Sequence, residues 1–118
     1  MKIILTYIKD LFFRSKLNYV EKQHGFTLLN TDNESDFFKK IEESSPQIIV
    51  FDLDWKSDEV IKIIQGLNKE KYILTAFYAH VHHDLLLLAK NAGCHYVFTR
   101  REFIGNFDRL LSSKFSKS

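Results

Sequence analysis

Short apolar runs along the chain alternate with stretches in which apolar residues recur every three or four positions. The clearest run is Ile48-Ile49-Val50-Phe51, which predicts a strand over residues 47–54 that is buried on both faces. Pro46 precedes this run, and a residue without an N–H group suits the entry to a strand. By similar patterns, further strands are predicted over residues 2–8, 26–30, 72–78 and 96–98.

Amphipathic segments lie between the predicted strands. The first covers residues 11–24, with Phe12, Phe13, Leu17 and Val20 at helical spacing and Asp10 placed to cap its N-terminus. Further helices are predicted over residues 34–43, from a cap at Ser57 to Leu67, and over residues 84–91 and 101–111. We expect a domain of residues 1–112 followed by a polar tail of residues 113–118.

Five strands that alternate with five helices are typical of an α/β fold, with a parallel sheet covered by helices on both faces. In such sheets, ligands and chemistry collect at the carboxyl ends of the strands. Asp52 and Asp54 end the most apolar strand and therefore lie at this edge. A Gly-rich phosphate-binding loop does not follow the first strand, which disfavours a nucleotide-binding function.

Composition narrows the class of protein further. The chain has 118 residues, of which 45% are hydrophobic and 27% are charged, and these values suit one globular domain. A net charge of +2 disfavours a dedicated nucleic-acid-binding module. The N-terminal apolar run is too short for a signal peptide or a membrane span, and one cysteine suits a reducing compartment. A cytoplasmic location without a membrane partner is therefore expected.

Two other groups of residues are candidates for function. His80, His82 and His83, with Cys94 and His95 further along, lack the spacing of a zinc site, so exposed loop histidines are expected. Leu85-Leu86-Leu87-Leu88 is apolar nearly all round, although a surface helix buries only one side. Leu86 and Leu87 are therefore predicted to contribute to a homodimer or partner interface.

The five strand–helix units, and above all segments 47–54 and 92–103, resemble the response-regulator receiver (CheY-like) domain. The resemblance covers essentially the whole chain. It implies a three-layer α/β/α sandwich of flavodoxin-like topology, with a five-stranded parallel sheet of order 2-1-3-4-5. It also makes the helix 84–91, strand 96–98 and helix 101–111 a frequent dimer or partner face.

The resemblance also implies a set of site residues. Asp52 matches the aspartate that accepts a phosphoryl group in receivers. The acidic pair that holds Mg²⁺ reads Lys9-Asp10 here, so Asp10 alone remains. Asp54 would matter mainly for its backbone carbonyl, the third metal ligand. Asp10, Asp52 and this carbonyl group would thus form a weak site for Mg²⁺, and no other cofactor is expected.

Two other family positions differ. Residues 77–80 offer no small hydroxyl group where receivers place a Ser or Thr. Thr99-Arg100-Arg101 stands where receivers have a Lys followed by Pro, and Arg100 is the candidate replacement for that Lys. The planar fork of an arginine is not equivalent to an ammonium group.

These matches predict a stand-alone, partly degenerate pseudo-receiver of two-component signal transduction, whose carboxylates are hydrogen-bonded to loop amides and to Arg100 or Lys9. It would not be an enzyme, and it would act through contacts with a protein partner or a histidine kinase, with impaired or no phosphorylation. One alternative is an active single-domain response regulator of a phosphorelay, phosphorylated on Asp52 by a histidine kinase. Another alternative, from a different class, is a small Mg²⁺-dependent phosphatase or hydrolase that uses Asp52 and Asp54.

Overall fold

The computed structural model describes residues 2–115, which form one five-stranded sheet. All neighbouring strands are parallel, and their order is β2-β1-β3-β4-β5. The strands are β1 (Ile3–Tyr7), β2 (Thr27–Thr31), β3 (Ile48–Asp52), β4 (Ile73–Tyr78) and β5 (Tyr96–Thr99). The predicted flavodoxin-like fold class and strand order are confirmed.

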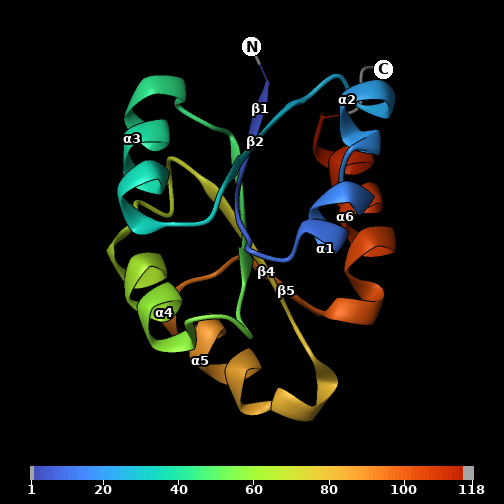
Figure 1. The fold of residues 1–118 in the computed structure, drawn as a ribbon. Coiled ribbons are helices and arrows are strands. Elements are labelled where there is room, and N and C mark those ends of the chain that lie inside the picture. Colours follow the sequence, from blue (N-terminus) through green and yellow to red (C-terminus); the bar gives the residue numbers. More distant parts are fainter. Residues whose placement is uncertain (1, 116–118) are drawn as a thin grey trace.

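Helices cover both faces of the sheet (Figure 1). The helices are α1 (Leu11–Lys16), α2 (Tyr19–Gln23), α3 (Glu34–Ser44), α4 (Ser57–Gly66), α5 (Asp84–Ala92) and α6 (Arg100–Phe115), with a short 3₁₀ turn over His80–His82. One face carries α3, α4 and α5, and the other carries α1, α2 and α6. Within residues 2–115, no helix is both long and apolar enough to cross a membrane.

The central strand β3 is buried at all five positions. Its side chains alternate between the two faces of the sheet. Ile49 and Phe51 pack in the core beneath α3, α4 and α5, whereas Ile48 and Val50 pack in the core beneath α1, α2 and α6. This two-sided burial explains why the sequence of β3 is continuously apolar rather than alternating.

The prediction of a single helix over residues 11–24 is wrong, because the chain forms two short helices there. The N–H groups of Leu17 and Asn18 bond to carbonyl groups three residues back, which tightens the end of α1 and lets α2 start in a new direction. Phe13 and Leu17 still reach the core, but Phe12 is 73% exposed rather than inward-facing.

Ser57 does not cap α4 as predicted. Its hydroxyl group donates to the carbonyl group of Leu53, 2.5 Å away, and Ser57 is the first residue of the helix. Lys56 precedes the helix in a left-handed conformation, with φ of 52°.

The last helix is longer than the predicted range of residues 101–111. Helix α6 continues to Phe115, whose ring packs edge-on against that of Phe26 with centroids 5.1 Å apart. This contact holds the last helical turn on the domain. The rest of the predicted tail, residues 116–118, lies outside the described residues.

A substitution at Phe103 of α6 tests the aromatic core between the sheet and helices α1, α2 and α6. It is fully buried against the rings of Phe13, Phe77, Phe98 and Phe107. Phe103→Ala is expected to lower the free energy of unfolding by about 3–5 kcal/mol, because it removes a buried ring and leaves a cavity. Chemical denaturation measures this change.

Phe12→Ala is the matched control, because it removes the same ring from an exposed position of α1. It should change the free energy of unfolding by no more than about 0.5 kcal/mol. Equal effects of the two substitutions would contradict the placement of these rings.

Candidate functional site

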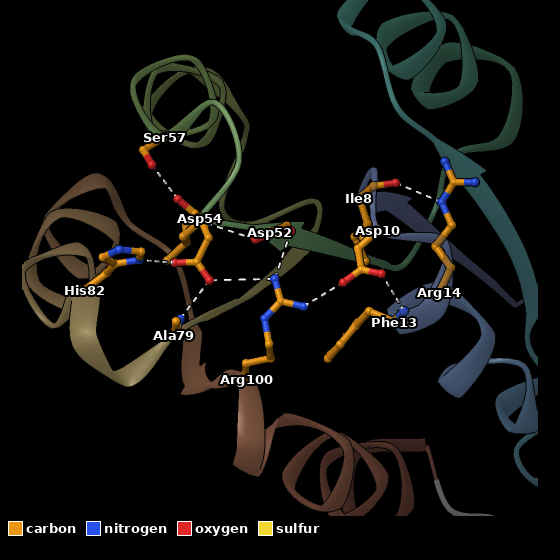
Figure 2. A network of polar contacts seen from close by, with 11 residues as sticks. Ile8, Asp10, Phe13, Arg14, Asp52, Asp54, Ser57, Ala79, His82 and Arg100 are labelled. Carbon is orange, nitrogen blue, oxygen red and sulfur yellow. Dashed lines mark hydrogen bonds and ion pairs between the residues drawn. The ribbon is translucent and has the colours of Figure 1, made fainter.

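Three carboxylates and one guanidinium group meet at the carboxyl edge of the sheet (Figure 2). Asp52 is the last residue of β3, and Asp54 follows it by two positions. Asp10 lies between β1 and α1, and Arg100 begins α6 directly after β5. The parallel strands end at this common edge, so residues distant in the sequence become neighbours here.

Arg100 joins these acids. Its Nη1 donates to Oδ2 of Asp10 at 3.0 Å, and its Nη2 donates to Oδ2 of Asp52 at 3.3 Å. Nη2 also lies 3.7 Å from Oδ2 of Asp54. One cation therefore neutralises part of the charge of three acids, and it does so with donors held in a rigid plane.

Two aromatic rings lie beneath the guanidinium group. Its central carbon is 4.9 Å from the ring centroid of Phe77 and 5.3 Å from that of Phe13. These two rings stack on each other with centroids 4.0 Å apart. The π faces attract the cation and restrict Arg100 to the position from which it contacts the acids.

Asp52 is almost closed off from solvent, since its side chain is 4% exposed. Its Oδ1 accepts a hydrogen bond from the backbone N–H of Asp54 at 2.9 Å, and its Oδ2 faces Arg100. Burial raises the pKa of Asp52, and the Asp54 amide and the Arg100 charge only partly offset this effect. Both carboxylate oxygens are thus engaged within the protein.

The pKa of Asp10 shifts in the opposite direction to that of Asp52. As predicted, it caps α1, because its Oδ1 accepts from the backbone N–H of Phe13 at 3.1 Å. This hydrogen bond and the Arg100 charge lower the pKa of Asp10. Its side chain is 39% exposed, so desolvation opposes the charged form less than it does at Asp52.

Asp54 contributes to the carboxylate cluster through its side chain. This role was not predicted, because the sequence led us to expect that mainly its backbone carbonyl group would matter. Its Oδ2 accepts from the backbone N–H of Ala79, and its Oδ1 lies 2.8 Å from Nδ1 of His82. The carboxylate thus ties the end of β3 to the segment after β4. A spacing of 25 residues between Asp54 and Ala79 leaves no local sequence signal for this contact.

A guanidinium group lies between the two carboxylates of the predicted Mg²⁺ site. Arg100 bridges Asp10 and Asp52, the two carboxylates that would have to share the ion. Magnesium requires several oxygen ligands in near-octahedral geometry. Among residues 2–115, no three His, Cys, Asp or Glu side chains form a group that could hold a metal ion, although the predicted site has only two carboxylates and a backbone carbonyl group. Lys9 is exposed and forms no ion pair with any residue between 2 and 115.

The other candidate residues do not form a second site. His80 and His83 are exposed, and Nδ1 of His95 accepts from the backbone N–H of Leu74 at 2.9 Å. Cys94 is buried, and desolvation raises the pKa of its thiol to about 12. A thiol in this state is a poor nucleophile and metal ligand at neutral pH.

The leucine run on α5 exposes an apolar surface. The most exposed pair of leucines differs from the predicted pair, Leu86 and Leu87. Leu87 is 62% exposed and Leu88 is 48% exposed, whereas Leu86 packs against the core and is only half-buried. Leu85 is buried beneath the helix. The exposed surface is therefore centred on Leu87 and Leu88.

Asp52 is one of the groups that make the stability of the protein depend on pH. Its pKa in the folded protein is raised from the ordinary value of 3.8, so its contribution to stability is lost as the pH rises through the raised pKa. Asp52→Asn is expected to increase the free energy of unfolding at neutral pH, because it removes the cost of burying a charged carboxylate, which is the largest cause of the raised pKa of Asp52. Denaturation at about pH 7 and about pH 4 should show the gain shrinking at the lower pH, where Asp52 takes up a proton.

Glu70→Gln is the control for loss of one negative charge, because Glu70 is exposed in the loop before β4. It should change stability by less than about 0.5 kcal/mol at either pH. A less stable Asp52→Asn protein at neutral pH would show that the Arg100 pairing outweighs the burial of the carboxylate.

No protein-family model matches the chain, and no curated protein matches its sequence. Solved structures do share its architecture. A response regulator from Thermotoga maritima aligns with a TM-score of 0.76 and 17% identity, over 95% of this chain and 98% of that chain. The signal receiver domain of a putative LuxO repressor protein from Vibrio parahaemolyticus aligns with a TM-score of 0.68 and 18% identity, over 95% and 90% of the two chains.

A LuxR family DNA-binding response regulator from Silicibacter pomeroyi aligns with a TM-score of 0.67 and 15% identity, over 96% of this chain and 92% of that chain. At these identities the likeness is one of backbone architecture. The chain therefore has the fold of the response-regulator receiver domains.

Proposed function

We propose that this chain is a receiver-like signalling domain that acts through protein–protein contacts and does not accept a phosphoryl group on Asp52. The contact of Arg100 with both Asp10 and Asp52 carries the proposal. The guanidinium group supplies from within the chain the positive charge that a divalent ion would otherwise bring to these carboxylates.

The chemistry of phosphoryl transfer supports this proposal. A carboxylate that attacks phosphorus needs an accessible oxygen, a divalent cation and donors for the charge on the transferred group. The Asp52 side chain is 4% exposed, and its oxygens are engaged by Arg100 and by the Asp54 amide. A phosphoryl donor would have to displace Arg100 from its place over Phe13 and Phe77.

The same contacts disfavour a hydrolase. Asp52 and Asp54 both face Arg100, so neither carboxylate is free to act as a nucleophile or general base. The domain would therefore transmit a signal by presenting its surface to a protein partner in the cytoplasm. A histidine kinase remains a candidate partner in this proposal, as a protein that the domain binds rather than as a phosphoryl donor.

Incubation of the full chain with acetyl phosphate and Mg²⁺ tests the proposal. Intact-mass spectrometry should detect no phosphoryl adduct on the wild-type protein, because Asp52 is covered by Arg100. Beryllofluoride with Mg²⁺ should likewise leave the amide NMR spectrum unchanged. Arg100→Ala should gain Mg²⁺ affinity by about tenfold, since it uncovers Asp10 and Asp52.

Arg109→Ala is the matched control, because Arg109 lies exposed on the same helix and, within residues 2–115, its side chain bonds only to Asn106. It should bind Mg²⁺ no better than the wild type. A wild-type adduct that is absent from Asp52→Asn would establish the active response regulator instead. Turnover of p-nitrophenyl phosphate would establish the hydrolase.

We also propose that α5 forms a contact between two copies of the chain, with the predicted α5–β5–α6 face as its site. Leu87 and Leu88 provide exposed apolar surface there. Asp84 lies in the first turn of α5 and Lys90 in the last turn. An antiparallel pair of these helices would place Asp84 of one copy near Lys90 of the other, and two-fold symmetry would repeat this pairing at both ends.

Sedimentation velocity over a range of concentrations measures this self-association. Leu87→Glu is expected to weaken the dimer by about tenfold or more, because it would bury a charge against an apolar surface. Leu11→Glu is the control, because Leu11 is a comparably exposed leucine on α1, at the other face of the sheet. A wild-type protein that stays monomeric at high concentration would refute the interface.

A further inference from the structure

A groove of about 950 Å³ lies beside the carboxylate cluster. Lys16 of α1 forms one side, and Ala79 and His80, which follow β4, form another. Residues at the start of α6, including Arg100 and Arg101, complete it. The volume falls within the range of small-molecule sites.

Three basic side chains, Lys16, Arg100 and Arg101, and the acidic Glu102 line this groove. Arg100 is already paired with the carboxylate cluster, so Lys16 and Arg101 supply the unpaired positive charge. The Glu102 carboxylate already accepts a hydrogen bond from the hydroxyl group of Thr99 at 2.8 Å. Within residues 2–115, neither Lys16 nor Arg101 forms an ion pair. Their charges are therefore available to an anion.

Arg100 has donors left for a ligand. A guanidinium group carries five N–H bonds. Arg100 uses one of them on Asp10 and one on Asp52, and in the described part of the chain the other three have no hydrogen-bond partner. An anion in the groove could be bound by Arg100 while the contacts with both acids persist.

The groove also has apolar surface. Ile104 lines it and is only half-buried. The ammonium group of Lys16 lies 5.0 Å from the ring centroid of Phe12, which is 73% exposed. A ligand that carries an apolar group would cover more of this surface than an inorganic anion could.

We infer that this groove binds a small organic anion, namely a phosphate monoester or a carboxylate attached to an apolar group. Its charge is held between Lys16, Arg101 and the free donors of Arg100, and its apolar part lies on Ile104. Charge complementarity favours the anion, and the mixed surface favours an organic one. This inference does not depend on whether Asp52 is phosphorylated.

Amide NMR titration of the full chain tests the inference, with phenyl phosphate and benzoate as the two anionic probes. We expect saturable shifts at Lys16, Ala79, Thr99 and Ile104, and at the side-chain N–H of Arg100, with a dissociation constant of about 1 mM or lower. The stronger of the two probes identifies the preferred anionic group. Benzyl alcohol and inorganic phosphate should each bind at least about tenfold more weakly, because each lacks one half of the ligand.

Lys16→Gln and Arg101→Gln should each weaken phenyl phosphate binding by about threefold to tenfold. Both side chains are exposed, so the variants should keep the wild-type fold. Lys90→Gln, which removes an exposed charge from α5, should have no effect. Absence of saturable shifts up to about 10 mM, or an equal loss in Lys90→Gln, would overturn the inference.

Discussion

Burial of β3 on both faces is the constraint on which the rest of the structure depends. Every residue of Ile48–Asp52 is buried, so helices must cover the strand from both sides. Parallel pairing of β3 with β1 and β4 then brings the carboxyl ends of these strands to one edge of the sheet. Asp52 is the last residue of this apolar strand and is therefore buried at that edge. A buried carboxylate needs a hydrogen-bonding or ionic partner. The contact with Arg100 meets this requirement.

The site shows how the environment separates chemically identical groups. Asp10 and Asp52 face the same guanidinium group, yet their pKa values move in opposite directions. Asp10 is 39% exposed and caps a helix, so its charged form is favoured. Asp52 is 4% exposed and lies near two other carboxylates, so its charged form is disfavoured despite Arg100. Asp54 completes the network by joining the end of β3 to Ala79 and His82.

A guanidinium group and a divalent ion differ as partners for these carboxylates. A bound ion depends on its concentration in solution and keeps open positions for a ligand. Arg100 is covalently part of the chain, so its charge is present at every metal concentration. It also contacts Phe13 and Phe77, which a hydrated ion would not favour. If the proposed function holds, Arg100 keeps the charge of the site constant. The neighbouring groove and helix α5 are then the surfaces that can bind a ligand or a protein partner.

The amino-acid pattern by itself determined the five strands, their alternation with helices and the position of Asp52 at a strand end, because burial on one or two faces leaves a local periodicity in the sequence. It also allowed Asp10 to be identified as a helix cap. Tertiary structure decided which side chains meet. Arg100 is 90 residues from Asp10 and 48 from Asp52, and its contacts depend on how α6 docks on the sheet. The break after Lys16, the exposure of Phe12 and the contacts of the Asp54 side chain were decided in the same way, because packing between distant segments leaves no periodic signal in the chain.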